Sequence, residues 1–252
     1  MDSGVRAQGI VSFNFSELVT NGYWPRSVSP CVDAEEMLSG DPTAGRLVLL
    51  TEGRSDRRAL EGGLSVLMPH MMEYFSFFDF DLSSSEGGAP ALVRMIRAFI
   101  GAGIKNRVVA IFDNDSAAKG ALGPLRRQGP LPRNFRVLQL PPLPLLRSYP
   151  TEGPSGTVRE NVNGRAASIE LYFGEDVLRR SDGSLTPVQW SAVEGGIRAW
   201  QGAVTDTDKA RLQRAFADKV ERWRGKAVPL DERTWDGMRR IIRSLTRAFA
   251  DA

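Results

Sequence analysis

Three carboxylates follow two apolar runs of this sequence, and their spacing predicts that they share a site. Asp113 and Asp115 follow the run VVAIF at 108–112, and Glu52 follows the run LVLLT. Side chains two residues apart on a strand point the same way, so Asp113 and Asp115 can converge. Glu52 joins them if the two runs are neighbouring strands, and Asp56 lies one helical turn beyond Glu52. We therefore expect an acidic cluster here.

Carboxylates at such close range repel one another unless a cation lies between them. Oxygen ligands without histidine or cysteine select magnesium, manganese or calcium rather than zinc. The sequence holds one cysteine and one histidine, which almost excludes a Cys/His zinc site. Because magnesium at such sites accepts substrate phosphate oxygens, the expected chemistry is phosphoryl transfer or phosphodiester hydrolysis.

The segments that carry these residues alternate between predicted strands and helices. Short apolar runs predict strands over 46–53, 72–81, 107–115 and 134–143. Helices are expected between them, over 55–64, 91–103 and 116–129. Ser55 is the candidate N-cap of the first helix. This alternation is typical of a parallel α/β sheet, in which ligands bind beyond the carboxyl ends of the strands.

The second half of the chain is predicted to be mostly helical. Residues 144–165 are rich in glycine and proline and are expected to form loops. Helices are predicted over 163–178, 205–223 and 231–249, with a short one over 33–38. The apolar residues of the last long helix recur every three or four positions, which favours packing against the parent domain over dimerisation. The expected division is a lead-in segment over 1–45, a catalytic core over 46–178 and a helical C-terminal region over 179–252.

The composition is typical of a globular protein and not of a membrane protein. Apolar residues make up 42% of the 252 residues, and no apolar run approaches the roughly 20 residues that span a bilayer. Cys31 is the single cysteine and no signal-peptide pattern is visible, so we expect a cytoplasmic protein. Arginine supplies most of the positive charge, which suits phosphate contacts but equally fits a G/C-rich genome.

Two short stretches together resemble a known family. EGRSD at 52–56 with FDND at 112–115 is similar to the Toprim domain, a module of topoisomerases, primases, recombination proteins and OLD-family nucleases. Residues 87–122 further resemble the HEPN/Toprim-associated proteins of bacteria, which are often grouped with antiphage defence. LQLPPL, NVNGRAASIELYFG and QWSAVEGGIRAWQGAV carry the same resemblance, which covers about residues 46–250.

The resemblance implies an OLD-nuclease-like Toprim core, a four-stranded parallel sheet flanked by helices with a helical C-terminal extension. By position, Glu52 would be the general acid/base and a metal-contacting carboxylate. Asp113 and Asp115 would bind the metal, which the resemblance implies to be magnesium or manganese. Glu170 would help to build a second metal site, and Asp56 would complete the set of ligands.

Basic residues are expected to interact with the phosphates of a nucleic acid. Lys119 or Arg165 would neutralise charge on the phosphate in the transition state, although Lys119 also fits the solvated side of a short helix. The other expected nucleic-acid-binding residues are Arg54, Arg240, Arg243 and Arg247. The last three form a stripe opposite the apolar side of 231–249, a pattern that is also typical of the solvated side of a packed helix.

The expected function is that of a metal-dependent nuclease that hydrolyses DNA or RNA phosphodiesters in antiviral defence, with another defence-system protein as a further partner. The alternative is a catalytically silent Toprim module that binds nucleic acid, a nucleotide or a partner protein. A haloacid dehalogenase-type phosphohydrolase would carry its Asp-x-Asp motif on the first strand and would leave Glu52 without a role. The oligomeric state is not predicted.

Overall fold

The structure is a computed structural model in which the chain divides into two compact units, residues 1–45 and residues 46–252. It describes residues 14, 16–21, 45–78, 87–127, 129–154, 156–192, 200–229 and 233–250. In the first unit the described part contains the short helix α1 (Ser16–Thr20). The helix predicted over 33–38 lies outside the described residues.

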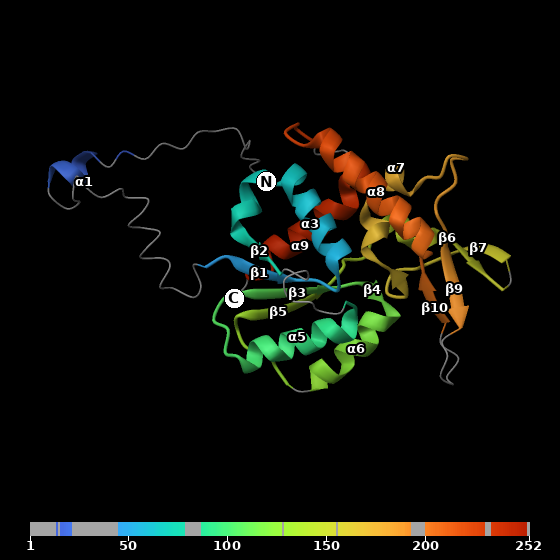
Figure 1. The fold of residues 1–252 in the computed structure, drawn as a ribbon, viewed down its shortest axis with the longest axis horizontal. Helices are drawn as coiled ribbons and strands as arrows, with labels where there is room; N and C mark the ends of the chain where they lie inside the picture. The colour runs from blue at the N-terminus through green and yellow to red at the C-terminus, as the bar shows by residue number, and fades with distance from the viewer. Residues whose placement is uncertain are drawn as a thin grey trace. The chain divides into compact units, whose positions relative to one another are not determined.

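The second unit is built on a sheet of four parallel strands in the order β2-β1-β3-β5 (Figure 1). The strands are β1 (Leu47–Leu50), β2 (Phe75–Phe77), β3 (Val108–Phe112) and β5 (Phe135–Gln139). Every residue of β3 is buried, as expected for a central strand that is covered on both faces. The predicted parallel α/β sheet is therefore confirmed, and β1 and β3 are direct neighbours with Leu49 paired to Val109.

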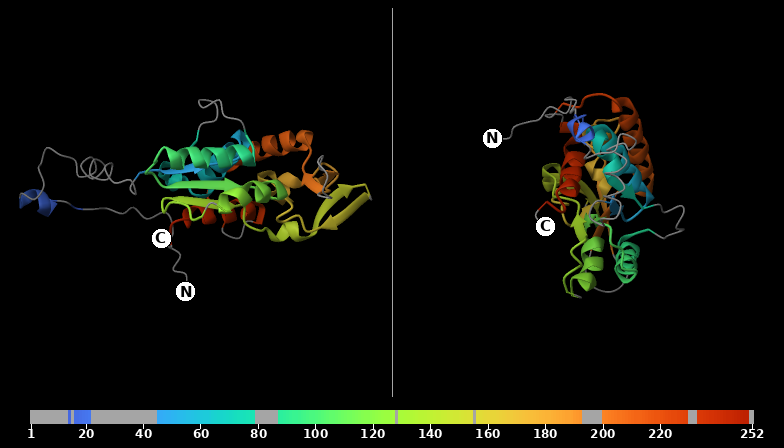
Figure 2. Two further views of the ribbon diagram at one scale, coloured as in Figure 1. Left: turned by 90° about the horizontal axis from the view of Figure 1, so that it is seen from below. Right: turned by 90° about the vertical axis from the view of Figure 1, so that its left-hand side faces the viewer.

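Helices cover both faces of this sheet, as Figures 1 and 2 show. One face carries α5 (Ala89–Gly101) and α6 (Ser116–Arg127), and the other carries α3 (Arg54–Leu67), α8 (Asp206–Trp223) and α9 (Asp236–Thr246). Alternation along β3 explains the two layers, because Val109 and Ile111 pack with the second group and Ala110 packs with the first. The sheet therefore has a separate apolar core on each side.

The helix α3 begins one residue earlier than predicted. Arg54 is its first residue and Gly53 is its N-cap, with no side-chain hydrogen bond at the cap. The prediction that Ser55 is the N-cap is therefore wrong. A 3-10 helix, η1 (Pro69–Tyr74), then leads from α3 into β2.

A second sheet was not predicted. Its strands have the order β10-β9-β6-β7, and only β6 and β9 are parallel. They are β6 (Tyr149–Gly153), β7 (Gly156–Glu160), β9 (Val188–Ala192) and β10 (Trp200–Ala203). The predictions of loops over 144–165 and of a wholly helical region over 179–252 are therefore wrong. The strand β7 is exposed along nearly its whole length, so its sequence lacks the apolar alternation that marks a strand.

The prediction of a helix over 163–178 is also wrong. This segment forms the short strand β8 (Ala166–Ala167), the 3-10 helix η3 (Ile169–Tyr172) and the single turn α7 (Glu175–Leu178). Gly174 separates the last two with a φ of 102°, which lies outside the helical region. All four residues of η3 are buried. An amphipathic helix would bury only one side, whereas this segment is surrounded by protein on every side.

The two C-terminal helices are confirmed, with α9 shorter than predicted. Thr205 is the N-cap of α8 and its hydroxyl accepts a hydrogen bond from the Asp208 N–H at 3.1 Å. The 3-10 helix η4 (Arg233–Trp235) leads into α9, and another, η2 (Pro144–Ser148), precedes β6. In the part of the chain that the structure describes, no helix has both the length and the apolar character that crossing a membrane requires.

Candidate active site

Glu52 and Asp113 meet at the carboxyl ends of the neighbouring strands β1 and β3. The Asp113 N–H donates a hydrogen bond to Glu52 Oε1 at 2.9 Å. The Glu52 carbonyl in turn accepts a hydrogen bond from the Gly88 N–H at 2.6 Å, which ties it to the start of α5. The parallel arrangement therefore brings together two acids that are 61 residues apart in the sequence.

Asp115 lies two residues further on, in the short strand β4 (Asn114–Asp115), which pairs with β8. Its Oδ1 atom accepts a hydrogen bond from the Ala118 N–H at 2.7 Å, which satisfies a free donor in the first turn of α6. Burial raises the pKa of the Asp115 carboxyl, although the N–H groups of Ala118 and Ala117 act in the opposite direction. Asp115 therefore has a capping role in addition to any functional one.

Asp56 and Glu170 complete the cluster from the first turn of α3 and from η3. Glu170 is only 4% exposed. Its two carboxylate oxygens accept hydrogen bonds from Gln213 Nε2 at 2.9 Å and from Ser168 Oγ at 2.7 Å. Both donors are neutral, so the Glu170 charge is held in place without being cancelled.

Like charge and burial shift the pKa values of the cluster upward. Burial raises the pKa of Glu52 to about 7, with a further contribution from the charge of Asp115. Burial and the charges of Glu170 and Glu52 raise the pKa of Asp56 to about 7. For Asp113, burial and the surrounding carboxylates hold the pKa well above its ordinary value. Such mutual repulsion shows that the acids share one local environment.

Two lysines supply nearby positive charge. Lys209, in the first turn of α8, lowers the pKa of both Asp56 and Asp115. Sequence reasoning missed Lys209, because only the fold shows that α8 begins beside α3. Lys119 also lowers the pKa of Asp115, and its Nζ atom donates a hydrogen bond to the Gly164 carbonyl at 2.6 Å.

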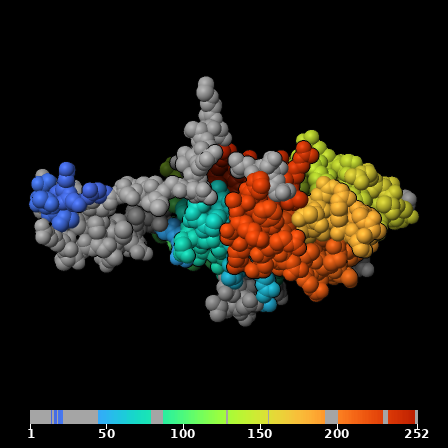
Figure 3. All heavy atoms as spheres, turned by 90° about the horizontal axis from the view of Figure 1, so that it is seen from above, coloured from blue at the N-terminus to red at the C-terminus, as the bar shows by residue number. Residues whose placement is uncertain are grey.

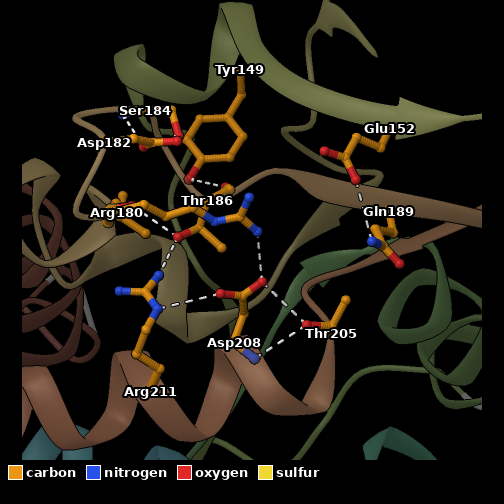
Figure 4. Close-up of polar contacts among 11 residues, drawn as sticks. Tyr149, Glu152, Arg180, Asp182, Ser184, Thr186, Gln189, Thr205, Asp208 and Arg211 are labelled. Atoms are coloured by element: carbon orange, nitrogen blue, oxygen red, sulfur yellow. Dashed lines mark hydrogen bonds and ion pairs between the residues drawn. The ribbon is translucent and has the colours of Figure 1, made fainter. Parts of the chain in front are cut away.

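The position of Lys209 depends on how the start of α8 is anchored (Figure 4). Asp208, the preceding residue, is paired with Arg180 at 2.9 Å and with Arg211 at 3.3 Å. Arg211 also donates a hydrogen bond to the hydroxyl of Thr186, whose carbonyl accepts one from the Tyr149 hydroxyl at 2.9 Å. This network ties α8 to the second sheet.

The arginines predicted to bind nucleic acid occupy different surroundings. Arg165 lies 4.5 Å over the Trp190 ring and 3.8 Å from the Glu160 carboxylate, so its guanidinium already has partners. Arg240 on α9 is paired with Asp236, whereas Arg243 on the same helix and Arg247, the C-cap, are exposed. Among the contacts of the described residues, none joins the side chains of these four arginines to the carboxylates of the acidic cluster.

Arg54 is different, because it lines a cavity next to the acidic cluster. The cavity has a volume of about 1080 Å³ and lies between α3 and α8. Gly53 and Gln213 are part of its wall, and they adjoin Glu52 in the chain and Glu170 through a hydrogen bond. A ligand in this cavity would therefore end beside the carboxylates.

The chemistry of the donor set fits a hard divalent cation. The candidate ligands are carboxylate oxygens, and their mutual repulsion would be relieved by positive charge. Within the described ranges, however, no group of three or more His, Cys, Asp or Glu side chains is arranged to hold a metal ion as it stands. The structure thus brings the predicted acids Glu52, Asp56, Asp113, Asp115 and Glu170 into one region without forming a complete coordination shell.

Comparisons with family models, with curated proteins and with solved structures found no match for this chain. The resemblance to Toprim domains therefore stays a prediction from residues 52–56 and 112–115. The function of the chain has to be inferred from its own geometry.

Proposed function

We propose that this chain is a divalent-metal-dependent nuclease of the Toprim type that hydrolyses nucleic-acid phosphodiesters. One observation carries the proposal. Glu52 and Asp113 are joined by a 2.9 Å hydrogen bond at the ends of two adjacent parallel strands, and the charges of Asp56 and Glu170 act on the same place. The carboxyl end of a parallel sheet is the usual position of a ligand site in α/β proteins.

The electrostatics of the cluster support a role in binding and catalysis. Several carboxylates held together at partial burial oppose folding unless something compensates them, and this pattern is found mainly at functional sites. The residues that would hold the ion are Glu52, Asp56, Asp113, Asp115 and Glu170. A bound magnesium or manganese ion would supply Lewis-acid chemistry at the scissile phosphate.

Glu52 has the properties of a general base or acid. Burial raises the pKa of Glu52 to about 7 in the metal-free protein, so this carboxyl group takes up a proton more readily than an ordinary glutamate does. The backbone N–H groups of Asp113 and Ala89 both donate hydrogen bonds to this carboxylate and fix its position, from which it would take the proton of an attacking water. Lys209 and Lys119 add positive charge on the side of Asp115, where it would balance the charge of a phosphate.

The order of the motifs along the chain agrees with the proposal. EGRSD begins two residues after β1, and FDND begins with the last residue of β3, so both stretches lie at the carboxyl ends of adjacent strands. The proposal includes the setting that the resemblance implies, which is antiviral defence in bacteria. A haloacid dehalogenase-type reaction is disfavoured, because β3 is the third strand of this sheet along the chain.

Specific contacts also favour the second candidate function, a catalytically silent module that binds nucleic acid, a nucleotide or a partner protein. The Asp115 carboxylate caps α6, and Glu170 is satisfied by two neutral donors. Both acids therefore have structural partners that would keep them in place without catalysis. The two candidates differ in whether any phosphodiester is cleaved.

A cleavage assay tests the proposal. Purified full-length protein is incubated with plasmid DNA, single-stranded DNA and RNA, with Mg²⁺, with Mn²⁺ or with EDTA. We expect metal-dependent cleavage of at least one substrate and a loss of at least 100-fold in Glu52→Gln and in Asp113→Asn. Asp218→Asn, a change of the same kind on the exposed side of α8, serves as the matched control. Cleavage that survives both site variants, or no cleavage by the wild type, would refute the nuclease.

A further inference from the structure

We infer that the cavity between α3 and α8 binds the phosphate backbone of a single-stranded nucleic acid and leads one strand to the acidic cluster. The inference rests on the proposed function, because it gives that site its substrate path. It assigns phosphate contacts to Arg58 and Arg214, two residues that neither the sequence motifs nor the acidic cluster includes.

The cavity runs along both helices. Its wall on α3 extends from Arg54 to Ser65, and its wall on α8 extends from Ala210, with Arg224 just beyond the end of that helix. At 1.5 Å per residue, the stretch along α3 is about 17 Å long, which gives room for a few nucleotides. Figure 3 shows α8 in orange-red across this face of the molecule, with α3 in cyan and teal beside it.

One end of the cavity adjoins the proposed catalytic residues. Gly53, which directly follows Glu52, forms part of that end together with Gly87. Gln213, also in the wall, donates its hydrogen bond to Glu170. A strand that lay along the cavity would therefore present a phosphate to the carboxylates at this end, while its other phosphates lay along the two helices near Arg58 and Arg214.

The charges of the wall favour an anionic ligand. Four arginines and two glutamates line the cavity. Glu61 is paired with Arg57 at 3.1 Å, and Glu221 is paired with Arg224 at 2.7 Å, so both acids are already neutralised. Arg58 and Arg214 are exposed and form no ion pair within the described part of the chain. They remain available for phosphate oxygens, which guanidinium groups bind well.

The cavity lies along the line where α3 and α8 touch each other, which favours a single strand over a duplex. Packed helices have axes 8–10 Å apart, and the close contact here is marked by Gly62, where an added Cβ would lie 3.0 Å from Val220. A duplex, whose major groove alone is about 12 Å wide, would touch only the rim. Phe216 and Val220 lie buried beneath this contact, so the exposed arginines are the main groups that the cavity offers to a ligand.

The test measures binding in the full-length Glu52→Gln variant with Mg²⁺, by fluorescence anisotropy of labelled 12-nucleotide DNA and RNA strands and of the corresponding duplexes. Arg58→Ala and Arg214→Ala are introduced separately and together. Arg97→Ala is the matched control, because Arg97 is an exposed arginine on α5, across the sheet from the cavity. Thermal unfolding by circular dichroism confirms that each variant is folded.

We expect each cavity variant to weaken single-strand binding about tenfold and the control to leave it unchanged. The salt dependence is the sharper readout. The slope of log K against log salt should fall by about 0.7 for each phosphate that the protein no longer neutralises, so by about 1.4 in the double variant. A merely structural arginine would not change this slope.

Several results would overturn the inference. They are an unchanged affinity in both folded cavity variants, tighter binding of the duplex than of the single strand, or displacement of the strand by an acidic peptide of equal charge at equal concentration. The cleavage assay separates this failure from failure of the nuclease. If Arg58→Ala and Arg214→Ala cleave as fast as the wild type, the role of the cavity is refuted and the nuclease is not. If single-strand binding needs both arginines but the wild type cleaves nothing, the nuclease is refuted and the binding site is not.

Discussion

Asp113 is the residue on which most of the like charge in the proposed site converges. Asp56, Glu52, Asp115 and Glu170 all raise its pKa in addition to burial. An ionised Asp113 therefore opposes folding at neutral pH unless a cation is bound. Carboxylates perturbed in this way are common at functional sites, which fits the proposed metal site.

Neutralising Asp113 should stabilise the protein in the absence of divalent ions. We expect Asp113→Asn to raise Tm in EDTA by a few degrees, because it removes repulsion from four neighbouring carboxylates. Mn²⁺ should raise the Tm of the wild type but not that of the variant. Differential scanning calorimetry in EDTA and in Mn²⁺ measures both effects, with Asp218→Asn as the control. A wild-type Tm that does not respond to Mn²⁺, Mg²⁺ or Ca²⁺ would argue against a metal site.

Glu170 separates a functional cluster from a structural one. Glu170→Gln keeps the shape of the side chain and an oxygen that can accept the Gln213 hydrogen bond, but it removes a buried charge next to Asp56. We expect at least a tenfold loss of metal-dependent cleavage with a Tm that is equal to or above that of the wild type. Glu175→Gln, an exposed change five residues further on, should alter neither. Full activity in Glu170→Gln would remove Glu170 from the ligand set.

At the residue scale, the sequence predicts the cluster but not its surroundings. Glu52 and Asp113 follow apolar runs, and parallel strands necessarily bring their carboxyl ends to one edge. Lys209, Gln213 and Ser168 could not be predicted as neighbours, because ordinary polar residues in a helix or loop carry no local signal of what they touch. Their roles follow only from where α8 and η3 lie.

At the scale of elements, the anchoring of α8 by Asp208 is the contact that places Lys209 and Gln213. Burial of the Asp208 carboxylate opposes its ionisation, but the charge of Arg180 and the hydrogen bonds of Arg180, Arg211 and Thr205 outweigh it, so the pKa of Asp208 is lowered. We expect Asp208→Asn to reduce the free energy of unfolding by about 1 kcal/mol at pH 7, allowing for partial exposure of the two arginines.

The pH dependence of this effect has a definite sign. Because the folded-state pKa of Asp208 lies below the ordinary value of 3.8, the unfolded chain binds more protons there, and the contribution is complete above that value. It is lost as the pH falls through the folded-state pKa. In urea unfolding, the difference between the wild type and Asp208→Asn should therefore be constant from pH 7 to pH 5 and shrink only below about pH 4. Asp206→Asn, in the same turn of α8, is the control.

Elements were predictable where burial imposes a pattern. The strands of the central sheet are apolar runs with helices between them, and this alternation specifies the parallel arrangement. The second sheet escaped prediction because β7 is exposed and β10 has four residues, which leaves too little periodicity. The segment around η3 resembles a helix in sequence, because Ile169, Leu171 and Tyr172 look like the apolar side of one. The sequence does not show that the whole segment is buried.

At the scale of the whole molecule, the candidate site draws on both halves of the second unit. Glu52, Asp56 and Asp113 come from the first strands and helices, whereas Glu170 and Lys209 come from the later segments. One face of the central sheet is likewise covered by late elements. Val109 and Ile111 of β3 belong to the same apolar core as Met238 and Ile242 of α9.

Residues 46–178 alone should therefore not fold, although they contain the whole predicted Toprim core. Without α8 and α9, the face of the sheet and of α3 that contacts Phe216, Trp235 and Ile242 would be exposed to water, at a cost of about 25 cal/mol for each Å² of apolar surface. We expect the fragment 46–178 to aggregate or to lack a cooperative unfolding transition, and the fragment 46–252 to unfold cooperatively. Circular dichroism melts and size-exclusion chromatography of both fragments make the comparison. A folded, monomeric 46–178 fragment that responds to Mn²⁺ would show that the site needs neither Lys209 nor the cavity wall on α8.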